Sequence, residues 1–197
     1  MLGAFAVGPS GRIAFRNWSR GIVIFEPREA KGAKYYHELE DPAGQTVKPS
    51  EDSLDWMPSG EGPTFLCTGK YQVPGVVYPD GVWVLHMDNG SISLVTPEDL
   101  VVSDYAWADN RPDLIAVVVG RVLQSTESQK RELGERALWT IYLVDLNGGV
   151  RTKLMEFEAW DVWGIDISPE GDKLVYSVER QLYLLDLETD PKEDSGE

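Results

Sequence analysis

The sequence predicts an all-β protein that consists of about four repeated units of antiparallel strands, with the last unit incomplete. Short runs of apolar, β-branched and aromatic residues alternate with tight turns along the chain. The same pattern of strand, turn and strand recurs about every 50 to 60 residues, which indicates a structural repeat. A third strand-like run follows, and in two units a turn containing Asn-Gly comes after it.

Each unit opens with an apolar strand, a tight turn and a second strand. The four turns lie at Pro9, Pro58, Asp109 and Pro169. Proline presets the backbone for a turn, and glycine and asparagine tolerate the positive φ of hairpins, so these segments are predicted to be hairpins. Trp56 and Trp107 precede their turns in phase with Ile167, and we expect both tryptophans in the core between neighbouring units.

The remaining strands complete the units unequally. Third strands are expected at 21–25, 82–88, 139–146 and 181–187, and fourth strands at 33–39, 91–95 and 150–157. The predicted units are 1–48, 49–98, 99–158 and 159–187, within one domain that covers 1–187. Residues 188–197 are polar and acidic, so they are predicted to form a disordered tail rather than a fourth strand.

Two insertions separate the second and third strands of their units. Residues 72–80 are rich in Pro and Gly, and residues 123–136 are rich in Ser, Glu, Lys and Arg. Because both insertions occupy the same place in the repeat, we expect them to project from one face. Both are predicted to be loops, with a short helix as the alternative for 123–136.

The fourth unit carries the clearest motif. Ile165-Asp166-Ile167-Ser168-Pro169-Glu170-Gly171-Asp172 leads into Lys173–Tyr176, and Leu182–Leu187 closes the unit. This segment resembles the blade motif of TolB-type propellers, in which Ser-Pro-Asp-Gly stands between two strands; Glu170 replaces the usual Asp. Residues 56–60, 7–11 and 107–110 are looser copies. The resemblance implies a TolB-like or WD-repeat-like β-propeller, a scaffold that binds proteins or peptides on its faces and in its channel.

Four blades are fewer than the six or more with which this family usually closes a ring. The leading model is an eight-blade ring shared by two identical chains, which makes the chain a homo-oligomer and most simply a dimer. A ring left open would expose an apolar blade face and the unpaired edge of the strand at 182–187. The alternatives are a piece of a longer propeller and a compact four-blade ring.

The charge balance limits the classes of partner. The chain carries 18 basic and 33 acidic residues, a net charge of −15, which disfavours nucleic acid and anionic membranes. No apolar run is long enough to span a bilayer, and the N-terminus lacks the basic region of a signal peptide. We therefore expect a cytoplasmic protein, or an extracytoplasmic one if a signal peptide has been removed. The single cysteine, Cys67, is expected to be buried.

The sequence contains no nucleophile elbow, dinucleotide-binding motif or phosphate-binding loop, and we expect no organic cofactor. His37 and His86 lie far apart and are expected to be structural. Asp55 and Asp166 occupy the same position in two first strands, so both are candidates to face a central channel. There they would bind a hard cation such as calcium, or they would simply accept hydrogen bonds in a solvated wall.

Aromatic residues beside arginine are typical of protein-contact surfaces. Trp18 lies between Arg16 and Arg20 in a predicted turn. Trp160 and Trp163 precede the predicted first strand of the fourth unit. The repeats and the missing catalytic motifs favour a non-enzymatic module for protein binding or self-assembly. The alternative is a hydrolase or lyase that uses the channel carboxylates and a divalent metal; a third hypothesis is an acidic mimic that occupies a basic site.

Overall fold

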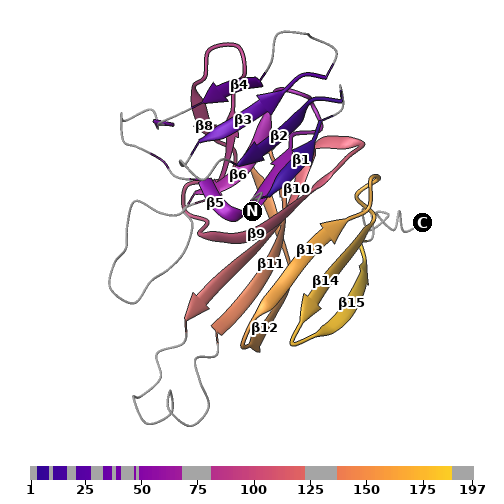
Figure 1. The fold of residues 1–197 in the computed structure, drawn as a ribbon. Helices are drawn as coiled ribbons and strands as arrows, with labels where there is room; N and C mark the ends of the chain where they lie inside the picture. The colour runs from indigo at the N-terminus through magenta and orange to yellow at the C-terminus, as the bar shows by residue number, and fades with distance from the viewer. Residues whose placement is uncertain are drawn as a thin grey trace, which may run out of the picture.

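The structure, a computed structural model, describes residues 4–8, 11–16, 21–27, 33–36, 39–40, 47, 49–67, 81–122 and 137–187. Within these ranges the regular structure consists of β-strands without a helix, so none of them forms a helix able to cross a membrane. The strands form four antiparallel sheets that follow one another along the chain, from indigo to yellow in Figure 1. We call these sheets blades 1 to 4. The all-β class and the four repeated units are confirmed.

Each blade is a meander in which consecutive strands are neighbours. Blade 1 contains β1 (Phe5–Val7), β2 (Ile13–Arg16), β3 (Ile22–Phe25) and β4 (Ala33–Tyr36). Blade 2 contains β5 (Pro49–Trp56), β6 (Pro63–Cys67), β7 (Val82–Leu85) and β8 (Ile92–Leu94). Blade 3 contains β9 (Val102–Ala108), β10 (Arg111–Val122), β11 (Ala137–Asp145) and β12 (Val150–Ala159). Blade 4 contains β13 (Val162–Ile167), β14 (Lys173–Val178) and β15 (Gln181–Asp186), so within the described chain the last blade has three strands, as predicted.

Three of the four opening hairpins use the same turn. Gly11, Gly60 and Gly171 have φ values of 75°, 81° and 77°. Their amides donate to the carbonyl oxygen three residues earlier at 2.9, 2.8 and 2.8 Å. Glycine adopts this backbone conformation without steric strain, which is why it recurs here. Blade 3 differs, because Ala108 pairs directly with Arg111 and a two-residue turn joins them.

Neighbouring blades pack in chain order, and each interface has its own apolar core. Trp56 lies in the core between blades 1 and 2, Trp107 between blades 2 and 3, and Ile167 between blades 3 and 4. Their exposed fractions are only 5%, 4% and 6%. The prediction that the two tryptophans belong to the core between blades is confirmed. Among the described residues, no core cluster joins blade 4 to blade 1.

Several strand ends differ from the sequence prediction. The apolar run at 114–119 forms a longer strand, because β10 begins at Arg111, which pairs with Ala108 of β9, and stays paired with β11 as far as Val122. β7 ends at Leu85 rather than 88, because the Gly90 amide donates to the His86 carbonyl at 2.8 Å and forms a turn. The 72–80 and 123–136 insertions and the 188–197 tail lie outside the described residues, as does His37.

Candidate functional site

The first strands of the blades lie beside one another and carry carboxylates. β5 packs against β1, and β13 packs against β9. Asp55 belongs to β5, Asp104 to β9 and Asp166 to β13. Each carboxylate accepts a hydrogen bond from the amide of the next residue, at 2.7, 2.9 and 2.8 Å respectively. This repeated local bond fixes the direction of each carboxylate relative to its strand.

Asp55 lies in an acidic environment. The residue as a whole is exposed, yet the protein around the carboxyl group excludes enough water to raise the pKa of that group. The hydrogen bond from the Trp56 amide lowers this pKa, and the charges of Asp109 and Asp166 raise it further. The structure thus brings the two predicted channel residues, Asp55 and Asp166, within electrostatic range of each other.

Asp104 is a carboxylate that the sequence analysis did not select. It is half-buried, and this burial raises the pKa of its carboxyl group to about 6. Hydrogen bonds from the backbone of Tyr105, Ile165 and Gly164 oppose the shift by stabilising the charged form. Because Gly164 and Ile165 belong to β13, Asp104 bridges blades 3 and 4. No sequence signal singled it out, since the other first strands lack an acid at the equivalent position.

The carboxylates do not form a cluster of metal ligands in the described part of the chain, where no three His, Cys, Asp or Glu side chains are grouped to hold a metal ion. Calcium binding by Asp55 and Asp166 stays a prediction. A calcium ion takes six to eight oxygen ligands, so two carboxylates alone would leave most of its coordination to backbone oxygens and water.

A buried polar contact joins blades 2 and 3. Thr64 in β6 is fully buried, and its Oγ1 accepts hydrogen bonds from Tyr105 Oη and Trp107 Nε1, both at 3.1 Å. Burial also raises the pKa of the Tyr105 hydroxyl well above its ordinary value, so the hydroxyl remains a donor at physiological pH. One hydroxyl therefore satisfies two aromatic donors in an otherwise apolar core.

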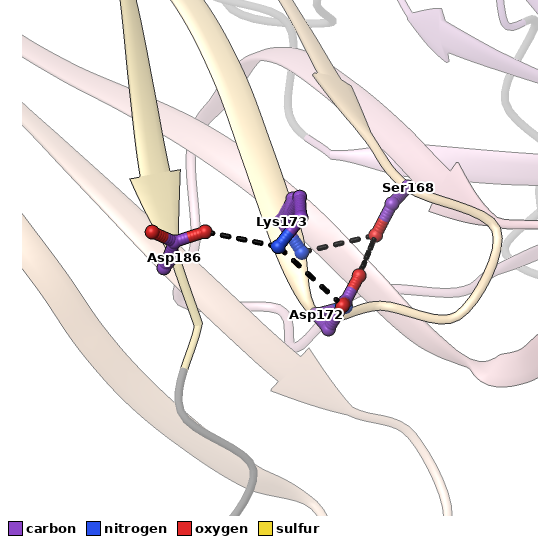
Figure 2. Close-up of polar contacts among 4 residues, drawn as sticks. All are labelled: Ser168, Asp172, Lys173 and Asp186. Atoms are coloured by element: carbon purple, nitrogen blue, oxygen red, sulfur yellow. Dashed lines mark hydrogen bonds and ion pairs between the residues drawn. The ribbon is translucent and has the colours of Figure 1, made fainter.

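The turn of blade 4 is held by the polar network in Figure 2. Ser168 Oγ donates to Asp172 Oδ1 at 2.6 Å and accepts from the Asp172 and Lys173 amides at 3.1 and 2.9 Å. Lys173 Nζ lies 3.0 Å from Asp186 Oδ1 on β15. These contacts explain the Ser-Pro-x-Gly-Asp motif as turn chemistry, and they give Asp172 a structural role.

An open groove of about 810 Å³ lies where blades 1 and 2 meet. Lys34 Nζ and Tyr36 Oη both donate to the Met87 carbonyl across this junction, at 2.8 and 2.9 Å. The groove mixes Arg12 and Lys34 with acidic residues, so its charge favours no single ligand class. His86 at its edge contacts Ser93 Oγ at 2.8 Å, which fits the structural role expected for this histidine.

The face of blade 1 that points away from blade 2 is apolar, and its β1 side chains are exposed. Phe5 pairs with Phe15 and Val7 pairs with Ile13 between β1 and β2, and Ile13 pairs with Phe25 between β2 and β3. These side chains therefore share one face of the sheet. Phe5 is 69% exposed and Val7 is 60% exposed. In blades 2 and 3 the positions of Val7 hold the buried Trp56 and Trp107. We call this surface the blade 1 outer face.

The face of blade 4 that points away from blade 3 carries exposed apolar side chains beside the Lys173–Asp186 ion pair. Val175 pairs with Leu184, and Ser177 pairs with Leu182, so all four share one face. Leu182 is 79% exposed and Leu184 is 68% exposed. The positions of Val175 in the preceding blades are occupied by residues that are fully buried: Ala14, Thr64 and Ala116. We call this surface the blade 4 outer face.

The structure describes three of the five predicted protein-contact residues. Trp160 and Trp163 are both exposed, on either side of the start of β13. Arg16 ends β2 and is half-buried. Trp18 and Arg20 lie outside the described residues, so the structure does not bring the five together as one surface.

No protein-family model and no curated protein sequence matches the chain. Solved structures match its shape. The Dos1 propeller is 9% identical with a TM-score of 0.56, over 94% of this chain and 44% of that one. An oligogalacturonate lyase in complex with manganese is 11% identical with a TM-score of 0.57, over 95% and 48%. TolB from Acinetobacter baumannii is 14% identical with a TM-score of 0.47, over 95% and 52%.

The fold is a β-propeller. The resemblance predicted from the blade motif is thus confirmed for the fold. The chain spans about half the length of these three solved propellers. In a closed propeller each blade is covered on both faces by its neighbours, whereas here the outer faces of blades 1 and 4 are exposed.

Proposed function

We propose that the chain is a non-enzymatic propeller module that assembles with protein through the outer faces of its two end blades. The observation that carries the proposal is a contrast in burial at equivalent positions. Val7 is 60% exposed, whereas its counterparts Trp56 and Trp107 are nearly fully buried. Because the same position in the repeat is core elsewhere, its exposure in blade 1 is best explained by a missing neighbour.

The chemistry of both outer faces supports association with protein. Contiguous exposed apolar patches on otherwise polar surfaces commonly mark contact sites. β15 is also the outermost described strand of blade 4, and its exposed leucines lie along a strand edge that is able to pair with another strand. The net charge of −15 favours a protein over nucleic acid or an anionic lipid surface. Trp160, just before β13, and Trp163, within β13, are exposed and extend this candidate contact region.

Light scattering on the purified chain tests the proposal. The expected result is a well-folded species heavier than the chain mass of 22.0 kDa, with a mass that depends on concentration. Exposed apolar faces that meet in the assembly should also bind less of a hydrophobic fluorescent dye as the concentration rises. A well-folded species of 22.0 kDa whose mass does not change at high concentration would contradict the proposal.

A second candidate function is a hydrolase or lyase that uses channel carboxylates and a divalent metal. Its support is the environment of Asp55, where burial, and further the charges of Asp109 and Asp166, raise the pKa of the carboxyl group. A propeller of similar fold is an oligogalacturonate lyase in complex with manganese. An acid whose pKa is raised by burial and by neighbouring charges is suited to hold or transfer a proton.

Calorimetric titration separates the second candidate from the first. Calcium, magnesium and manganese are titrated separately into the wild-type chain and into Asp55→Asn and Asp166→Asn variants. The metal-dependent function requires saturable binding that either substitution weakens at least about tenfold, as expected for the loss of a charged ligand. An absence of heat with all three ions at millimolar concentration excludes it.

A further inference from the structure

We infer that the protein that covers the end blades is a second copy of this chain, placed head to tail. Blade 4 of each copy then packs on blade 1 of the other, and two chains form one closed ring of eight blades. This inference rests on the proposed function and names its partner. It follows from the repeat itself, because the two exposed faces are the two complementary halves of one type of interface.

Every internal interface of the chain joins the same two kinds of face. The first strand of the following blade contributes the position of Trp56, and the second strand of the preceding blade contributes the position of Ala14. These two residues share a core between blades 1 and 2. Trp107 and Thr64 repeat the pairing with a hydrogen bond between blades 2 and 3. The interface between blades 3 and 4 repeats it again, with Ile167 in the first position.

The two outer faces supply what such an interface lacks. Blade 1 presents Val7 at the position of Trp56, without a preceding blade to receive it. Blade 4 presents Val175 at the position of Ala14, without a following blade to cover it. An unrelated partner would have to complement two different surfaces, whereas a second copy carries the complement of both. Head-to-tail contacts between identical chains form a closed ring when the rotation between them closes.

Side-chain sizes at the two faces also complement each other. Inside the chain a large residue meets a small one, as Trp56 meets Ala14, and as Trp107 meets Thr64. At the outer faces both members are of intermediate size, because Val7 replaces a tryptophan and Val175 replaces an alanine or threonine. The summed volume of the two facing side chains therefore changes less than the volume of either one alone. Such compensation preserves close packing in a core.

The number of blades agrees with a shared ring. The described chain forms four blades, and propellers typically contain four to eight blades around a central channel. Two copies reach eight blades. The chain also covers 44% of the Dos1 propeller and 48% of the oligogalacturonate lyase, so two copies have about the length of one such single-chain propeller.

Opposite charges placed on the two faces test the geometry. Val7→Glu and Leu184→Lys are each made alone, and Val150→Glu serves as a matched control because Val150 is exposed on β12, away from both faces. In a head-to-tail ring each of the first two substitutions disrupts both interfaces of a homodimer. We therefore expect the wild type and the control at twice the chain mass, and each face variant at the chain mass.

Mixing the two face variants gives the decisive result. The heterodimer keeps one wild-type interface and gains a Glu–Lys pair at the other, so an equimolar mixture should return to twice the chain mass. Circular dichroism establishes that each variant is folded, and Phe5→Glu with Leu182→Lys provides a second pair on the same faces. If either face variant alone keeps the wild-type mass, or if folded variants fail to associate on mixing, the head-to-tail ring is wrong. A monomeric wild type would instead overturn the proposed function as well.

Discussion

Replacement of Asp104 by Asn is expected to stabilise the protein at neutral pH. Burial between blades 3 and 4 raises the pKa of this carboxyl group from 3.8 to about 6. The folded protein therefore binds the proton more tightly than the unfolded chain does. The favourable contribution of the protonated group is complete below about pH 4 and is lost as the pH rises through 6, so the charged form weakens the fold at pH 7.

The size of the effect follows from the shift. A difference of roughly two pKa units corresponds to about 3 kcal/mol at most, since each unit is worth about 1.4 kcal/mol. Asp104 is only half-buried, and solvent screening reduces this figure to about 1–2 kcal/mol. Asparagine retains one carbonyl oxygen with two lone pairs, so the substitution removes the charge and keeps an acceptor for at most two of the three amides of Tyr105, Gly164 and Ile165.

Urea unfolding followed by tryptophan fluorescence measures the expected gain. Asp104→Asn should raise the free energy of unfolding by about 1–2 kcal/mol at neutral pH, and most of this gain should disappear near pH 4. Glu98→Gln removes the same charge from an exposed residue and controls for the net acidity of the chain. The reasoning fails if Asp104→Asn is no more stable than this control at neutral pH, or if its advantage does not depend on pH.

Three further pairs of substitutions test the cores and the turns by thermal or urea unfolding. Thr64→Val leaves two buried aromatic donors without an acceptor and should destabilise the protein by about 2 kcal/mol, whereas Thr64→Ser should not; equal effects would contradict the hydrogen-bonded role. Both Gly171 and Gly11 have positive φ, so alanine at either position costs about 1–2 kcal/mol of stability. Gly171→Ala should destabilise the protein more than Gly11→Ala, because only at Gly171 would the added Cβ meet a neighbouring side chain, Leu114, at 2.7 Å. Trp107→Ala should destabilise by about 3–5 kcal/mol and Trp18→Ala far less, and similar losses would refute the alignment of the blades.

The sequence was sufficient to predict the repeat, because its evidence is local. Proline and glycine at the hairpin turns, with tryptophan at a fixed distance before them, identified the blades and placed Trp56 and Trp107 in the cores. Strand length was harder to predict. β10 continues to Val122 because it stays paired with β11 as far as Ala137, and this pairing joins segments that are separated in the sequence. Periodicity within the strand itself does not reveal it.

The candidate site was predictable only in part. Asp55 and Asp166 were found because they share a position in the repeat, and the structure places them in mutual electrostatic range. Asp104 was missed because its environment comes from Gly164 and Ile165, about sixty residues further along the chain. The outer faces were foreseen in outline from the unclosed ring. Which side chains form them depends on the strand register, which the sequence pattern alone does not specify.

The sequential packing of the blades also has a consequence for how the chain opens. Among the described strands, the main contacts between blades join blades that are neighbours in sequence, and such quasi-one-dimensional proteins unfold in stages rather than in one step. The strands of blade 1 have three or four residues, whereas those of blade 3 have seven to twelve. Amide hydrogen exchange should therefore be slowest in blade 3 and fastest at the N-terminal end. A molecule that contacts blade 1 would then stabilise the part of the chain that opens most readily.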